Sequence, residues 1–74
     1  MDTARIMAYV FAMDYSTLCH PPSRQQMFEQ LNIENPLVIL LVEHWIRVRR
    51  SRMEQEQAMM GKLSQVTKEF AKFQ

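Results

Sequence analysis

The chain of 74 residues has one cysteine, Cys19, so it cannot form an internal disulfide. A disulfide-stapled secreted scaffold is thereby excluded, and the composition fits a reducing compartment. With His20 and His44, Cys19 gives three nitrogen or sulfur ligands at most, whereas a structural zinc site takes about four. We therefore expect no metal and no other cofactor, and we expect Cys19 to act as a small buried hydrophobe.

Glycine is equally scarce, since Gly61 is the only one. The chain has no Gly-rich phosphate loop, no paired-carboxylate motif and no nucleophile-base spacing, so we expect no enzymatic activity. Glu43 and His44 are adjacent, but neighbouring helical residues point about 100° apart and cannot act on one atom. We expect Glu43 to be solvated and His44 to pack at a helix boundary.

Long apolar runs are also missing, because the longest covers residues 37–42 and a membrane span takes roughly 18 residues. The apolar stretch 6–13 has no small-residue cleavage site and runs into Asp14, which argues against a signal peptide. We expect a cytoplasmic protein without a membrane contact. A chain this short forms one domain at most, with modest stability.

The formal net charge is only +1, too small for bulk attraction to nucleic acid or anionic membrane. The charge is unevenly distributed, however, with four arginines inside six residues: Arg47, Arg49, Arg50 and Arg52. Guanidinium groups bind phosphate or carboxylate bidentately, so these residues are candidates for partner binding. The alternative is a solvated helix face on which they pair with Glu43, Glu54 and Glu56.

Apolar residues three and four apart predict two helices in the first half of the chain. The first is capped by Asp2 or Thr3 and ends near Leu18, before the prolines of the connector 20–22. The second begins with a capping box of Ser23 and Gln26. It ends near Asn32, a residue type that tolerates the left-handed conformation of a helix terminus.

A third helix begins at Asn35 and Pro36, a capping side chain followed by a proline. Its first half is apolar nearly all round, so we expect it to be buried centrally, with a solvated extension beyond Arg47. Gly61 is expected to interrupt this extension. The prediction is an all-α fold: a small compact bundle of about three helices over residues 1–57, with a mobile amphipathic tail over 58–74.

The tail repeats apolar residues at spacings of three and four: Met59, Leu63, Val66, Phe70 and Phe73. Alone it is barely two heptads long, too short to hold a coiled coil. Among the seven methionines, we assign Met7, Met13 and Met27 to the core; another three on the polar extension suggest a docking surface: Met53, Met59 and Met60. Phe70 and Phe73 are expected to anchor a helix in a partner's groove.

A helix-turn-helix reader of DNA does not fit. The positions of the third helix that would meet base edges hold residues 37–40, all of them apolar and without donors. Two other functions stay open. One is a structural protein that self-associates through the Met and Phe face of the tail. The other is a non-specific nucleic-acid binder that uses the arginines.

The segments MDTARIMAYVFAMDYSTLCHPPS, RQQMFEQLNIENP and WIRVRRSRMEQEQ, with the amphipathic tail, resemble small phage-encoded inhibitors and antiterminators of bacterial RNA polymerase, of the type found in lytic Xanthomonas phages. The resemblance lies in size, helical layout, single cysteine and tail. It implies a monomer that binds the N-terminal part of the polymerase β′ subunit and the β flap near the RNA exit channel, where contact with nascent RNA also becomes feasible. Such a protein displaces sigma and hinders hairpin formation during elongation.

Overall fold

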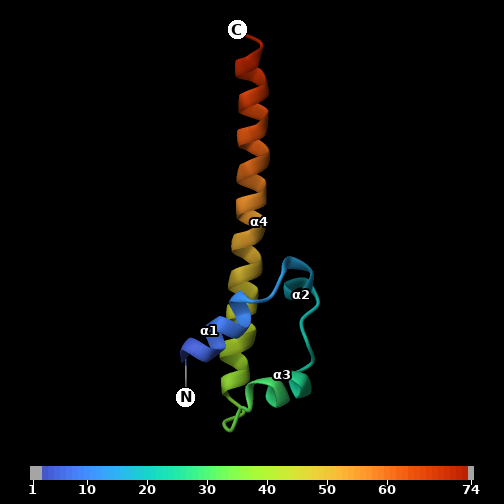
Figure 1. Cartoon of the computed structure of the whole chain (residues 1–74), viewed down its shortest axis with the longest axis vertical. Coiled ribbons are helices and arrows are strands. Elements are labelled where there is room, and N and C mark those ends of the chain that lie inside the picture. Colours follow the sequence, from blue (N-terminus) through green and yellow to red (C-terminus); the bar gives the residue numbers. More distant parts are fainter. Residues whose placement is uncertain (1–2, 74) are drawn as a thin grey trace.

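The computed structural model describes residues 3–73, and within this range the regular elements are all helices. They are α1 (Thr3–Phe11), α2 (Tyr15–Cys19), α3 (Arg24–Leu31) and α4 (Val38–Ala71). The three short helices pack against the first half of α4, and its second half projects alone, which makes the molecule 61 Å long and 21 Å wide (Figure 1). The predicted all-α class is confirmed.

The N-terminal region forms two helices, so the prediction of one helix ending near Leu18 is wrong. α1 ends at Phe11, and the extended Asp14 caps α2 by accepting a hydrogen bond from the Thr17 backbone N–H at 2.8 Å. An aspartate at this position competes with helix continuation because it satisfies a free donor of a new helix. The expected cap Asp2 lies outside the described residues, and Thr3 is already helical.

α3 has both ends where the sequence placed them. The Gln26 backbone N–H donates to the Ser23 hydroxyl at 3.3 Å, and the Ser23 N–H donates to the Gln26 side chain at 3.2 Å, which confirms the capping box. Asn32 ends the helix with a φ of 52°, the predicted left-handed cap. These contacts are local in sequence, which is why the pattern alone predicted them.

α4 begins two residues beyond the predicted Pro36. The Asn35 side chain accepts from the Leu37 N–H at 3.0 Å, and the regular helix then starts at Val38. The prediction that its first half is buried all round is wrong, because Leu37 and Leu40 are 69% and 52% exposed. The short helices cover only one side of α4, so the outward-facing leucines stay in contact with solvent.

The core is a single cluster that joins all four helices. Its buried members are Ile6, Val10, Leu18, Met27, Leu31, Ile39, Val42 and Ile46. Tyr9, Trp45 and Met53 pack around this cluster and are partly buried. We call residues 3–53 the head.

Beyond the head, α4 continues without a break through Gly61, so the predicted interruption at this residue is wrong. Glycine in a helix interior costs about 1 kcal/mol relative to alanine, which is too little to end a long helix. Every described residue from Glu54 onward is exposed. We call residues 54–71 the projecting segment. The division of the chain at residues 57 and 58 remains a prediction, as does the mobility of 58–74.

Candidate functional site

A row of exposed apolar side chains follows the projecting segment. We call it the apolar stripe, and it comprises Met59, Leu63, Val66, Phe70 and, in the turn after the helix, Phe73. These side chains are between 50% and 89% exposed. Spacings of four and three residues alternate along it, and residues so spaced share one face of a helix. A contiguous apolar surface of this kind marks a site of interaction with another molecule.

The projecting segment is exposed along its described length, and its one hydrogen bond to the head within residues 3–73 joins Glu54 to Tyr15. Helices in proteins gain most of their stability from burying an apolar face. Here that face is formed but uncovered within residues 3–73. A protein partner that covered the apolar stripe would therefore stabilise the helix that carries it.

The four arginines nominated from sequence do not form one cluster in space. Arg47 and Arg50 line a groove beside Pro21 and Pro22, on the side of α4 that α3 covers. Arg49 and Arg52 instead border a small depression next to Phe11. Because consecutive helical residues diverge by about 100°, four arginines within six positions point in different directions. One flat phosphate-binding face is not formed.

Arg49 contributes to the head itself. Its guanidinium carbon lies 4.7 Å from the centre of the Phe11 ring, a cation–π contact between α4 and the end of α1. Its Nε is buried and has no hydrogen-bond partner within residues 3–73. Arg49 therefore helps to fix the exposed Phe11 ring against α4, a contact between distant residues that sequence spacing did not predict.

The expected carboxylate partners of the arginines are engaged elsewhere. Arg24 binds Glu43 with two hydrogen bonds of 2.9 and 3.0 Å, which raise the pKa of the guanidinium further. Glu54 accepts from the Tyr15 hydroxyl at 2.9 Å. The Cys19 thiol and then Glu54 raise the pKa of Tyr15 to about 12. The predicted helix-face pairing with Glu43 and Glu54 is therefore wrong.

The four cluster arginines make no ion pair within residues 3–73, and this includes the remaining expected partner, Glu56. Their positive charge is thus available at the two sides of α4. Glu43 is half-buried and not freely solvated as expected. His44 is exposed and meets the Trp45 ring edge-on, with 5.8 Å between ring centres.

The methionines divide only in part as predicted, because Met7, assigned to the core, is half-buried and is not among the described side chains that form or pack against the core cluster. Met27 is buried, Met13 packs against the core, and Met59 and Met60 are 68% and 64% exposed. Met53, expected on the docking surface, packs against the core and is half-buried, so its assignment was wrong. It lies where α2 crosses α4, a contact that depends on the unpredicted start of α2 at Tyr15. Cys19 is half-buried and its thiol is free.

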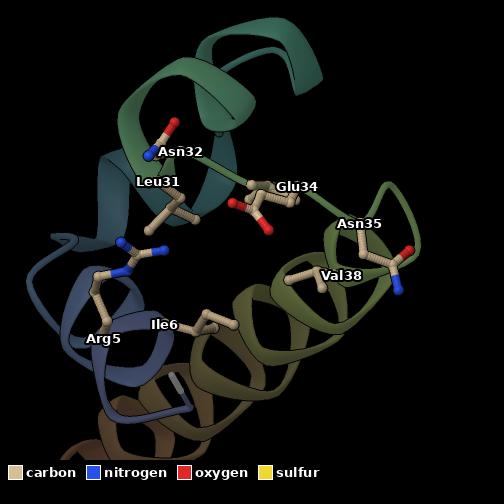
Figure 2. A pocket seen from close by; sticks show the side chains of 8 residues that line it. Arg5, Ile6, Leu31, Asn32, Glu34, Asn35 and Val38 are labelled. Atoms are coloured by element: carbon tan, nitrogen blue, oxygen red, sulfur yellow. The ribbon is translucent and has the colours of Figure 1, made fainter. Parts of the chain in front are cut away.

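A cavity of about 530 Å³ opens between α1, the end of α3 and the turn before α4. Figure 2 shows the Glu34 carboxylate directed into this hollow from the turn and Arg5 approaching from α1. Ile6, Leu31 and Val38 form its apolar floor. The charged side chains of its lining are Arg5 and Glu34.

No group of three or more His, Cys, Asp or Glu side chains within residues 3–73 could hold a metal ion. Nor does any helix in that range combine the length and the apolarity that crossing a membrane requires.

Comparison of the chain with protein-family models, with curated proteins and with solved structures finds no match.

Proposed function

We propose that this protein is a non-catalytic regulator that acts by binding another protein chain through the apolar stripe. The observation that carries this proposal is the exposure of the stripe, 50–89% for each side chain, on the part of α4 that projects beyond the head and in the turn that follows it. An amphipathic helix that stands clear of its own domain can place anchors three and four residues apart in an apolar groove. Phe70 and Phe73 are the largest of these anchors.

Bacterial RNA polymerase is the partner we propose for a regulatory role, in keeping with the resemblance to phage inhibitors and antiterminators. In this proposal the projecting segment docks at the N-terminal part of β′ and the β flap, which displaces sigma at initiation and favours antitermination during elongation. Arg49 and Arg52 lie on the same helix as the apolar stripe, and guanidinium groups suit acidic or phosphate groups around such a groove.

The test is capture of partners from a nuclease-treated bacterial lysate by the tagged full-length chain. We expect polymerase subunits to be recovered with sigma depleted. Replacing Phe70 and Phe73 together by alanine should lower recovery at least about tenfold, because truncating two anchors commonly costs more than 1 kcal/mol each. Replacing Lys68 by alanine, on the far side of the helix, is the matched control and should leave recovery unchanged.

The outcome also separates protein binding from nucleic-acid binding. A phosphate-directed binder would tolerate the two phenylalanine substitutions and would lose binding when Arg49 and Arg50 are replaced by glutamate. The division of the arginines between two sides of α4 does not favour that function. Normal capture by both double variants would refute the proposed surface altogether.

Self-association is the second candidate function, favoured by the regular alternation of four and three residues along the apolar stripe. This spacing is typical of a helix that packs along its length against another helix.

A further inference from the structure

We infer that the apolar stripe pairs with the same stripe of a second copy of this chain, and that the two helices run antiparallel. The inference rests on the second candidate function, self-association, and it names the orientation and the register of the two copies at the same surface. It commits to a second copy because spacing, charge and helix length together fit that occupant.

The short length of the amphipathic tail does not prevent such pairing, because the tail continues a longer helix. Two heptads alone cannot hold a coiled coil, because helix nucleation is costly. Here, however, α4 is already nucleated inside the head, where Ile39, Val42 and Ile46 are buried. The projecting segment only propagates that helix, so pairing has to stabilise an existing helix and not create one.

The charges on the same seam exclude a parallel pair. Continuing the alternation of three and four from Met59 toward the N-terminus leads to Glu56 and Arg52. In a parallel pair each seam residue faces its own counterpart, so the two Glu56 carboxylates and the two Arg52 guanidiniums would be forced together. Like charges at the seam are strongly unfavourable.

An antiparallel pair centred between residues 64 and 65 avoids these contacts. In this register Met59 of one copy lies opposite Phe70 of the other, and Leu63 lies opposite Val66. Two-fold symmetry repeats each contact, so the central four layers are apolar. Each apolar stripe is thus covered by its own counterpart, as an isologous interface requires.

The flanking positions in this register are complementary. Lys62 precedes Leu63 and Glu69 precedes Phe70, so both border the seam on the same side. Antiparallel pairing brings Lys62 of one copy beside Glu69 of the other, and symmetry forms this opposite-charge pair twice. On the other side Met60 meets Thr67, whose hydroxyl already donates to the Leu63 carbonyl at 2.9 Å and leaves its methyl group available.

The two heads fit this arrangement because they lie at opposite ends. Phe73 of one copy falls opposite Glu56 of the other, three residues beyond the end of the head at Met53. A stable interface buries about 1,200 Å² or more in total. Aromatic side chains bury roughly 150–250 Å² each, so the four phenylalanines of two copies cover about half of this, and the smaller stripe residues supply much of the rest.

A charge-exchange cycle tests the register with the full-length chain, with the dimer dissociation constant measured by sedimentation equilibrium. Lys62→Glu and Glu69→Lys should each raise the constant about tenfold, because two attractive pairs become repulsive. The double variant Lys62→Glu/Glu69→Lys restores opposite charges and should return within about threefold of the original. Lys68→Glu makes the same change of charge as Lys62→Glu, but on the face of the helix away from the seam, and should leave the dissociation constant nearly unchanged.

Disulfide trapping tests the orientation in a Cys19→Ala background. Leu63→Cys mixed with Val66→Cys should give a crosslinked heterodimer, while each variant alone should stay uncrosslinked. Crosslinking of Leu63→Cys with itself would show a parallel pair and overturn the inference. The inference would also be overturned if the dissociation constant of the Lys62→Glu/Glu69→Lys variant failed to return toward the original value. That measurement is made with Cys19 in place.

A chain that stays monomeric at millimolar concentration would also overturn the dimer. The proposed function is tested separately from the dimer, because the lysate capture uses the chain at a low concentration, at which it is monomeric in either case. If the chain is monomeric and Phe70→Ala/Phe73→Ala still abolishes capture, the stripe binds a foreign protein only. If the dimer forms and nothing else is captured through the stripe, the inference stands without the polymerase.

Discussion

The head and the projecting segment use the same sequence pattern with opposite results. In the head, α4 presents Ile39, Val42 and Ile46, and all three are at most 3% exposed. In the projecting segment it presents Leu63, Val66 and Phe70 at similar spacing, and these are 50–68% exposed. An amphipathic period therefore specifies that a face is to be covered, but it does not specify which chain covers it.

Truncation of a leucine should lower the free energy of unfolding far more in the head than in the projecting segment. Leu18→Ala removes a fully buried side chain from the head and should lower the free energy of unfolding by about 2–5 kcal/mol. Leu63→Ala removes the same atoms from an exposed position and should change it by about 0.5 kcal/mol or less. Urea unfolding followed by circular dichroism, at a concentration where the chain is monomeric, measures both values. Equal losses would mean that the projecting segment is packed in the single chain.

A smaller effect is expected at Gly61 in the projecting segment. A Cβ built at Gly61 meets no atom within 4 Å, so Gly61→Ala should fit without strain. It should stabilise the helix locally by about 1 kcal/mol, because alanine loses less backbone entropy. Helicity by circular dichroism and amide exchange of residues 58–68 should both report it. Unchanged exchange there would show that the segment is already rigid.

The smallest effect concerns the junction of α1 and α2. Hydrogen bonds from the Thr17 backbone, and then from its side chain, lower the pKa of Asp14. A lowered folded-state pKa contributes stability above the unfolded value of about 3.9, and this stability is lost as pH falls through the folded-state pKa. The midpoint temperature of thermal unfolding should therefore decrease as the pH is lowered below about 4. Asp14→Asn keeps a capping side chain but has no carboxylate, so it should reduce the dependence of the midpoint temperature on pH in this range. If the dependence is unaltered in Asp14→Asn, other carboxylates cause it.

The contacts that sequence predicted well are those between near neighbours. The Ser23–Gln26 capping box and the left-handed Asn32 involve residues within three positions, so local chemistry sufficed. The cap at Asp14 is equally local but was masked by the apolar period that runs past it. The Arg24–Glu43 and Phe11–Arg49 contacts span 19 and 38 positions, and no spacing rule connects such residues.

The candidate site shows the same division. The spacing of Met59, Phe70 and Phe73 predicted an apolar helix face, and these residues are exposed on α4 and in the turn that follows it. The half-burial of Met53 and the separation of the arginines followed from the docking of α2 and α3 on α4, which sequence did not specify. The nominated arginines thus remain candidates on two separate surfaces.

The amino-acid sequence by itself determined that the chain is helical, where α3 begins and ends, and which residues share the apolar stripe, because helix periodicity and capping act over a few residues. Only the tertiary structure decided that three short helices cover one side of one half of α4. Burial depends on which distant segments dock, and the head reaches only to Met53. The rest of α4 keeps a formed apolar face for another chain to cover.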